Sequence, residues 1–285
     1  MGDLMILKKL RKSKSGVSNI LSTILITALM VTSTALTYSV IIPTIDRGRI
    51  NATLSTSALF LNKLDGAMQT LMYDGVGASR NLEVDAFAGS LEFRTQGLNV
   101  RTFVDGSLFF PVPGLSFGIA RFTIPSEIAI MDRSNIDYIK GSAYYPLAVT
   151  DEGAVDPAMI TLTRPSGDEY RMELWYRLFV HIKDSGVDGT IDLSIVVVEF
   201  SASESVRTLN EGNYNLMLNK SSLEVNPSRY GFTGGNPEST SGDDFYMTVN
   251  KNTGPEIIYS STGARTSINI NLVVITIGIE VISLF

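Results

Sequence analysis

The sequence predicts an α+β protein with one long N-terminal helix followed by an all-β, antiparallel, sandwich-like ectodomain. Residues 15–45 contain no charged side chain and are rich in Leu, Ile and Val, which is typical of a helix that crosses a membrane. Apolar residues then recur at helical spacing up to residue 71, and after residue 80 the pattern changes to the alternation typical of β-strands. We therefore expect a helical segment over 17–75 and a β-rich domain over 80–285.

The charge of the chain is divided unevenly. The 285 residues include 23 Lys and Arg, 29 Asp and Glu, one His and no Cys, for a net charge of −6. Residues 1–16 hold five basic side chains and one acidic side chain, a net of +4, so the rest of the chain carries −10. The composition excludes disulfides, thiolate metal sites, a Cys nucleophile and any zinc site that needs two imidazoles.

Residues 17–42 are long enough to span a bilayer, since about 20 apolar residues cross its hydrocarbon core. Basic flanks stay in the cytoplasm, so residues 1–16 are expected to be a cytoplasmic leader and the acidic domain is expected to be extracellular. Hydropathy leaves three interpretations open: an uncleaved signal anchor, a signal peptide cleaved after Ser33-Thr34-Ala35, and a helix that is cleaved only at its cytoplasmic end.

A basic cluster and one small residue stand directly before the apolar helix. The sequence KKLRKSKSG is followed at once by VSNILSTILITALMV, which places Lys12, Lys14 and Gly16 beside Val17. This junction resembles the class III signal peptides of the archaeal type IV pilin and archaellin family, and the resemblance covers about residues 8–75. It implies that a membrane prepilin peptidase cleaves between Gly16 and Val17. It further implies that the apolar helix stays in the mature protein and packs against like subunits.

The helix is expected to continue past the membrane as an amphipathic segment over 44–73. Pro43 should kink the helix, and Gly75 or Gly77 should end it. An apolar seam with heptad-like spacing, interrupted only at Ser57, would be its packing face: Ile50, Leu54, Leu61, Leu64, Met68 and Leu71. Two partners remain open for this seam, the chain's own β-domain and a neighbouring helix.

Turn signals divide the rest of the chain into many short strands. We expect strands over 90–93, 99–104, 107–110, 118–124, 159–162, 169–183, 190–200, 214–218, 245–249, 256–259 and 267–281. A turn is expected at 111–114, a long loop over 226–244, and two sub-sheets divided near 126–140. The run 190–200 is apolar enough for a central strand. Residues 268–285 are expected to form a strand or hairpin, with a second membrane span as the alternative.

The sequence offers little catalytic chemistry. His181, the one imidazole, alternates with apolar neighbours and is predicted to be a strand residue rather than a general base. Three carboxylates lie four residues apart, unlike the ligands of an EF-hand loop: Asp184, Asp188 and Asp192. We therefore predict no catalytic residue, metal or cofactor, and no enzyme activity. The acidic domain also argues against binding nucleic acid.

Two sequons are candidate N-glycosylation sites, Asn51 and Asn219, as expected for a surface protein.

Together these features predict a pilin-like structural subunit of the cell surface. The chain would be a single-pass membrane protein with its N-terminus in the cytoplasm, processed by a prepilin peptidase and able to assemble with like subunits into filaments. The alternative is a signal-anchored surface protein with a β-sandwich ectodomain that binds a ligand or mediates adhesion and does not polymerise. An anchored hydrolase is a third class, which the missing His and Cys chemistry disfavours.

Overall fold

The computed structural model describes residues 3–85, 89–104, 107–126, 130–132, 135–141, 148–150, 156–184, 190–231, 245–250, 255–261 and 267–284. The chain forms two compact units, Met1–Asn51 and Ala52–Phe285. The first is entirely helical where it is described, and the second, called here the β-rich unit, contains the end of the helix and all described strands.

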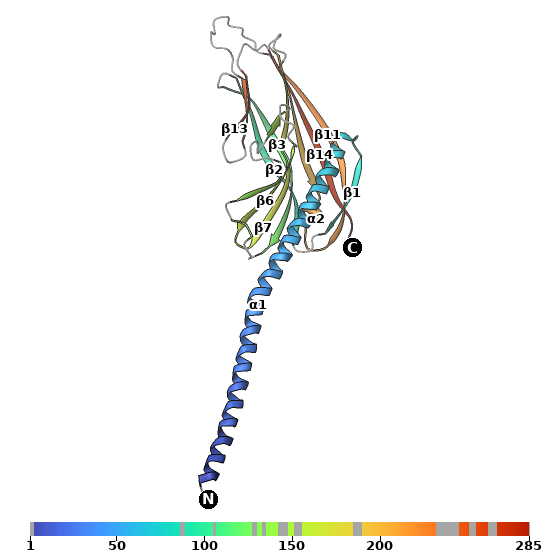
Figure 1. Ribbon diagram of the computed structural model, residues 1–285. Coiled ribbons are helices and arrows are strands. Elements are labelled where there is room, and N and C mark those ends of the chain that lie inside the picture. Colours follow the sequence, from blue (N-terminus) through green and yellow to red (C-terminus); the bar gives the residue numbers. More distant parts are fainter. Residues whose placement is uncertain are drawn as a thin grey trace. The chain divides into compact units, whose positions relative to one another are not determined.

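One continuous helix, α1 (Asp3–Tyr73), confirms the expected long N-terminal helix (Figure 1). It runs through Pro43 and ends where the sequence places its stop. Gly77 has a φ of +91°, a left-handed conformation that glycine adopts without strain. A long apolar helix followed by a mostly β unit is thus the observed architecture.

The strands form two sheets in the described part of the chain. The six-stranded sheet has the order β1 (Ser79–Asp85), β11 (Asn213–Gly231), β14 (Ser267–Leu284), β9 (Thr190–Ala202), β8 (Leu178–Asp184) and β5 (Ala148–Thr150). The eight-stranded sheet has the order β13 (Pro255–Ser261), β12 (Phe245–Asn250), β2 (Ser90–Val104), β3 (Ser107–Pro125), β7 (Glu169–Tyr176), β6 (Ala158–Ser166) and β4 (Ile136–Lys140), with β10 (Thr208–Leu209) also paired to β2. A short helix, α2 (Glu204–Arg207), precedes β10.

Most strand pairs are antiparallel, as expected, but β14 pairs with β9 and β5 pairs with β8 in parallel. The C-terminal segment forms the strand β14, which agrees with a strand rather than a second membrane span. Five elements were not anticipated from the sequence: β1, β4, β5, α2 and β10.

The turn expected at 111–114 is wrong, because this segment lies inside β3. It pairs with β2 through a register shift between Leu98 and Val100, whereas β7 pairs only with Ile119–Pro125 of β3. The first half of β3 therefore has one edge without a partner among the described strands, where prolines that lack an N–H are tolerated. The four short strands expected over 90–124 are consequently two long ones.

The single strand expected over 169–183 is also wrong, because the chain changes sheet at Arg177. This side chain is 2% exposed. Its backbone N–H donates to the carbonyl of Pro157 at 2.9 Å, and its Nη2 donates to the carbonyl of Asp156 at 2.5 Å. These bonds hold the connection between β7 and β8.

Two further expectations about organisation are corrected. The two sheets are not divided near 126–140, because strands from both sides of that segment enter each sheet. The loop expected over 226–244 is wrong for residues 226–231, which continue β11 and pair with the start of β14. Residues 232–244 lie outside the described residues.

The two sheets share an apolar core. Figure 1 shows the long strands β2 and β3 in green and β11 and β14 in orange and red. The core is built from alternate residues of both sheets: Val100, Leu115, Phe117, Ile119, Met159, Trp175, Leu178, Val180, Ile191, Leu193, Ile195, Val197, Ile268 and Ile270. The predicted central strand β9 supplies four of these residues, which agrees with its apolar sequence.

The helix residues of the β-rich unit pack on other side chains of these strands. Phe122 lies three residues after the core residue Ile119 on β3. Because side chains alternate along a strand, Phe122 points to the other face of the sheet. There it meets Phe60 of α1, edge to face, with ring centroids 5.7 Å apart. The amphipathic end of α1 therefore covers a sheet of its own chain.

A buried lysine holds the C-terminal end of α1. Lys220 of β11 is 3% exposed, and its Nζ donates to the carbonyls of Met72 and Asp74 at 2.9 and 2.8 Å. Its backbone accepts from the N–H of Gly77 and donates to the carbonyl of Ala78, both at 2.9 Å. A cation there satisfies carbonyls that the helix leaves without partners and complements the negative end of its dipole.

β3 and β9 approach each other closely at Gly118. A Cβ added at Gly118 would lie 2.2 Å from the ring of Phe200. The N–H and Oγ of Ser116, two residues before Gly118, donate to Oε1 of Glu199 at 3.2 and 2.6 Å. The glycine is therefore required by packing at this point.

We expect Gly118→Ala to lower the free energy of unfolding by about 1–3 kcal/mol, because the methyl group overpacks against Phe200. The double variant Gly118→Ala, Phe200→Leu should lose less than the sum of the two single losses. Urea unfolding of the full chain in lipid nanodiscs, followed by fluorescence of the single tryptophan Trp175, measures this. Gly97→Ala is the matched control, because a Cβ at Gly97 meets nothing within 4 Å. Equal stability of the two alanine variants would contradict the packing argument.

Candidate functional site

The first half of α1 presents an exposed apolar surface. Residues 19–73 form the one described helix that is long and apolar enough to cross a membrane, and its most apolar window is 0% buried. Over residues 20–45, large apolar side chains are 47–68% exposed: Ile20, Leu21, Ile24, Leu25, Ile26, Leu29, Met30, Val31, Leu36, Tyr38, Val40, Ile41, Ile42 and Ile45. An apolar surface of this extent marks a membrane or protein contact.

Seven of the Ser and Thr hydroxyls in this segment bond to the helix itself. Each donates to the carbonyl of the residue three or four positions earlier, at 2.7–2.9 Å: Thr23, Thr27, Thr32, Thr34, Thr37, Ser39 and Thr44. A hydroxyl that is satisfied in this way can enter an apolar environment at little cost. The Ser and Thr content is therefore compatible with lipid or with close packing between helices.

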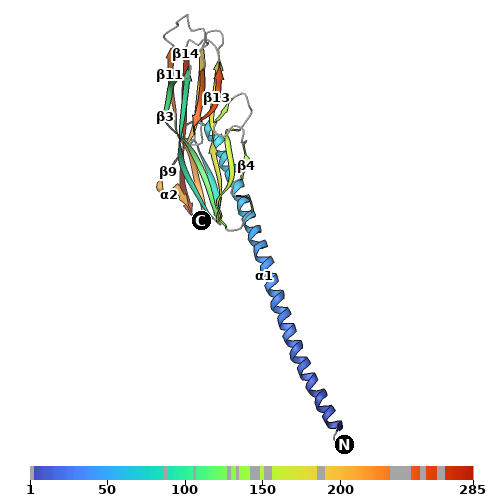
Figure 2. The same cartoon turned by 90° about the vertical axis from the view of Figure 1, so that its left-hand side faces the viewer.

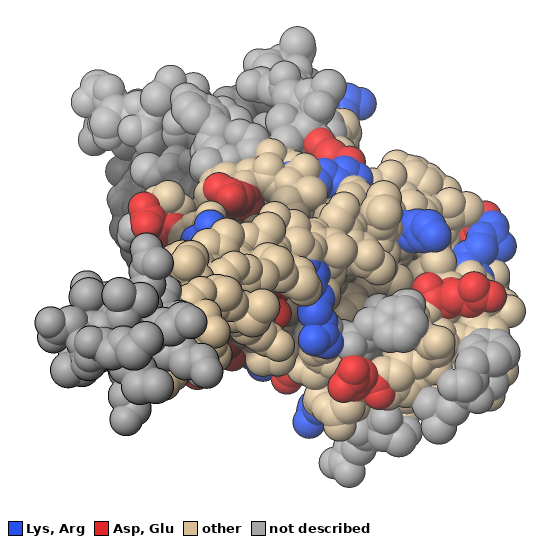
Figure 3. Space-filling model, turned by 60° about the horizontal axis from the view of Figure 1, so that its bottom comes forward, with Lys and Arg blue, Asp and Glu red and all other residues tan. Residues whose placement is uncertain are grey.

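Outside this segment the described surface carries charges of both signs. Figure 3 shows Lys and Arg interspersed with Asp and Glu on one face of the molecule, among uncharged residues. Residues 15–45 contribute none of these charges.

The seam predicted in the second half of α1 is buried within the β-rich unit. Leu61, Leu64, Met68 and Leu71 are 0% exposed and Leu54 is 8% exposed. Ile50, which belongs to the first unit, is 8% exposed. Of the two partners left open by the sequence, the chain's own β-strands occupy the seam from Leu54 onward, so this part is not available to a neighbouring helix.

A buried carboxylate fixes this helix segment to the strands. Asp65 is 2% exposed and accepts hydrogen bonds from Lys140 of β4, from the hydroxyl of Tyr176 of β7, and from Gln69 at 3.2 Å. Nζ of Lys140 also lies 2.6 Å from Oδ2 of Asp156. Figure 2 shows β4 beside α1. We call Asp65, Gln69, Lys140, Asp156 and Tyr176 the Asp65 cluster.

The charges of the Asp65 cluster shift two pKa values upward. Burial, and then the charge and hydrogen bond of Asp65, raise the pKa of Tyr176 well above its usual value. Burial alone would lower the pKa of Lys140, but the two carboxylates outweigh it and raise this pKa. The cluster is therefore built around a protonated phenol and a charged lysine.

No protein-family model, curated protein or solved structure matches this chain. The functional assignment therefore rests on the residues themselves.

The residues of the predicted cleavage site, Lys12, Lys14, Gly16 and Val17, all lie within the helical backbone of α1. Their side chains lie outside the described part of the structure. Of the two sequons, Asn51 is exposed on α1. Asn219 is half-buried in β11, where its Oδ1 lies 2.2 Å from the place of a Cβ on Gly278. Asn51 is thus the more accessible acceptor of the two.

The remaining residues considered in the sequence are one histidine and three aspartates. His181 is exposed on β8 while Val180 is buried, which confirms the predicted alternation. Asp192 accepts a hydrogen bond from Asn269 at 2.6 Å. The side chains of Asp184 and Asp188 lie outside the described residues.

Sequence reasoning missed the Asp65 cluster. The available signal was the position of Asp65, four residues after Leu61 and three before Met68, which places an acidic residue on the edge of an apolar seam. Its partners Lys140 and Tyr176 come from strands 75 and 111 residues away, which local spacing cannot reveal.

The raised pKa of Tyr176 predicts that stability falls in alkali. A group that binds its proton more tightly in the folded state stabilises fully below its unfolded-state pKa, about 10 for Tyr, and loses this contribution as the pH rises further. Lys140, whose pKa is also raised, acts in the same direction. We therefore expect the free energy of unfolding to decline above about pH 10.

In Tyr176→Phe this alkaline decline should be shallower. At pH 8 the variant should be less stable by about 1–3 kcal/mol, because Asp65 loses a buried donor. Urea unfolding at pH 8, 9, 10 and 11 measures both effects. Tyr138→Phe, which removes an exposed hydroxyl from β4, should retain the parent profile. A Tyr176→Phe variant with the parent alkaline slope would refute the assigned role.

Proposed function

We infer that the protein is a pilin-like structural subunit of the cell surface. In this proposal residues 17–42 hold the precursor in the membrane, a prepilin peptidase cleaves between Gly16 and Val17, and the helix then packs against copies of itself. The β-rich unit would be a sandwich-like ectodomain on the outside of the cell, without a part in bond chemistry.

The observation that carries the proposal is the contrast between the two halves of α1. Residues 20–45 are apolar and exposed, and seven of their Ser and Thr hydroxyls bond to carbonyls of the same helix. From Leu54 onward, the seam of the helix is buried on the strands of the same chain. A helix that only anchored a domain would not need to continue without a break into that domain, since a flexible linker would serve.

The contrast also indicates how subunits would meet. The seam from Leu54 to Leu71 packs within the chain. Contacts between the helices of neighbouring subunits would therefore use the segment that contains residues 20–45. Moving that segment from lipid to a helix bundle gains close packing rather than a hydrophobic transfer, since both surroundings are apolar. Small residues such as Ala28, Ser33 and Ala35 allow helices to approach closely.

Processing gives the first test. When the full chain is expressed in membranes with an archaeal prepilin peptidase, we expect the mature N-terminus at Val17, measured by intact mass and N-terminal sequencing. Gly16→Phe should block cleavage, because it replaces the small residue at the junction with a bulky one. Gly48→Phe is the matched control and should be processed normally, since Gly48 has open space around its Cβ position. An intact Met1 in the presence of active peptidase would refute this step.

Assembly gives the second test. Because the chain has no native cysteine, any disulfide must involve the introduced residue. Single cysteine substitutions from Ile24 to Leu29 should form disulfide-linked dimers in oxidised membranes at positions three or four apart, because one face of the helix meets its neighbour. Tyr73→Cys, at the end of α1 and 92% exposed, is the control and should crosslink weakly.

This crosslinking distinguishes the proposal from a solitary membrane anchor. No dimer at any position of the scan, or dimers as abundant for Tyr73→Cys as for the scan, would favour a surface protein that does not polymerise. Crosslinks with helical periodicity would not arise from random collision, because collision samples all faces of the helix equally.

A further inference from the structure

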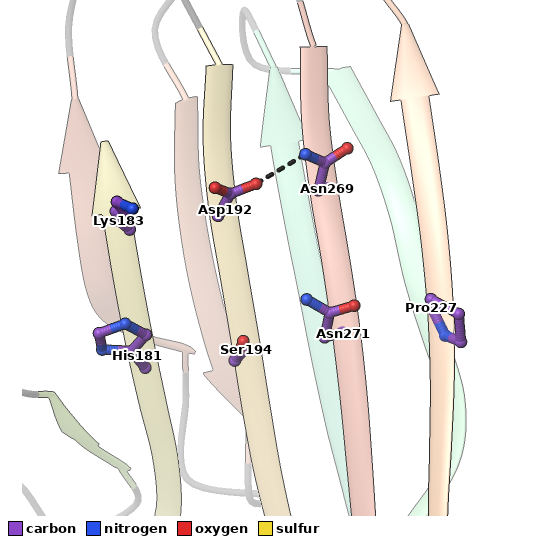
Figure 4. A pocket seen from close by; sticks show the side chains of 7 residues that line it. All are labelled: His181, Lys183, Asp192, Ser194, Pro227, Asn269 and Asn271. Carbon is purple, nitrogen blue, oxygen red and sulfur yellow. Dashed lines mark hydrogen bonds between the residues drawn. The ribbon is translucent and has the colours of Figure 1, made fainter. Parts of the chain in front are cut away.

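A polar groove crosses the surface of the six-stranded sheet. Side chains from three adjacent strands line it, and Pro227 of β11 lies at its border. The three strands contribute two residues each: His181 and Lys183 of β8, Asp192 and Ser194 of β9, and Asn269 and Asn271 of β14. Figure 4 shows these side chains on one face of the sheet. Its volume of about 520 Å³ is within the range of small-ligand pockets, about 300–1,000 Å³.

The strand register arranges the groove in two rows. Lys183, Asp192 and Asn269 lie opposite one another in one row, and His181, Ser194 and Asn271 form the next. The residues between them along β9 and β14, Leu193 and Ile270, belong to the core. Alternation therefore directs the polar side chains away from the core, on a framework fixed by pairing with both neighbouring strands.

The groove combines donors and acceptors in fixed positions. Nδ2 of Asn269 donates to Oδ1 of Asp192 at 2.6 Å, which orients both side chains. Oδ2 of Asp192 and Oδ1 of Asn269 then remain as acceptors, while Nζ of Lys183 and the amide of Asn271 can donate. The charges of Lys183 and Asp192 cancel, so the groove favours a neutral ligand.

An apolar row adjoins the two polar rows on the same face. Phe179 lies two residues before His181 on β8, and it pairs with Val196, which in turn pairs with Val273. All three are half-buried. A ligand long enough to extend from the groove past His181, Ser194 and Asn271 would thus meet hydrocarbon beyond the hydrogen-bonding groups.

We propose that this groove binds a neutral saccharide, as part of an oligosaccharide chain. A sugar ring carries vicinal hydroxyls, each of which donates and accepts, and a face of C–H groups. The two polar rows match the hydroxyls, and the row of Phe179, Val196 and Val273 matches the C–H face. An anionic ligand fits less well, because the carboxylate of Asp192 lines the groove in the middle of one polar row, between Lys183 and Asn269.

The test uses the full chain in phospholipid nanodiscs prepared without glycoside detergents, which would compete for the site. The probes are immobilised oligomers of mannose, glucose, galactose and N-acetylglucosamine, with sialylated and sulfated glycans for comparison. Affinity for the best neutral probe is then measured by biolayer interferometry. The variants are Asn269→Leu and Lys183→Ala. Asn81→Leu, at an exposed position of β1, is the matched control.

We expect the parent chain to bind at least one neutral oligomer with a Kd below about 1 mM. Asn269→Leu should weaken this binding at least about tenfold, since Asp192 loses its partner and the ligand loses an acceptor. Lys183→Ala removes only an exposed side chain, so it keeps the test valid if Asn269→Leu fails to fold. It should weaken binding severalfold, and Asn81→Leu should leave it unchanged. Binding to no neutral probe, binding confined to anionic glycans, or affinity unchanged in folded variants would overturn the proposal.

Discussion

The buried carboxylate of Asp65 is the constraint on which the β-rich unit depends. Removing a carboxylate from water costs several kcal/mol unless charged and neutral donors replace its hydration. Lys140, Tyr176 and Gln69 supply these donors from β4, β7 and α1 itself. The donors come together only at one rotation and one height of the helix against the strands. Apolar packing alone would tolerate small slips of Leu61 and Leu64 along the sheet, whereas the carboxylate does not.

The two halves of α1 therefore differ in the kind of contact that each can make. From Leu54 onward the helix is held by specific polar bonds and is closed at its end by Lys220. Over residues 20–45 seven Ser and Thr hydroxyls bond to their own helix, so shape and small residues rather than polar partners would select a neighbour. A surface of this kind can exchange lipid for other helices without breaking a hydrogen bond. The proposed change from membrane precursor to assembled subunit needs this property.

The sequence predicted those parts of the fold that depend on local pattern. The apolar span, the amphipathic continuation, the stop near Gly77 and the central strand β9 all follow from periodicity within one segment. Features that depend on distant pairing were missed. Pro111 and Pro113 predicted a turn, because proline is rare inside a paired strand. They are tolerated in β3 only because β7 does not pair with this part of the strand, which the local sequence does not reveal. Arg177 gave no sign of a change of sheet, since its partners at residues 156 and 157 belong to another segment.

The polar groove is another feature that depends on distant pairing, and the same strand pairing contributes to the core. Asn269 and Asp192 are 77 residues apart and meet because β14 pairs in parallel with β9. The same pairing places Ile268 and Ile270 in the core, on the other face of β14. Core and groove therefore both depend on the position of β14 between β9 and β11. Without β14, β9 and β11 would each have an unpaired edge, so this strand completes the six-stranded sheet.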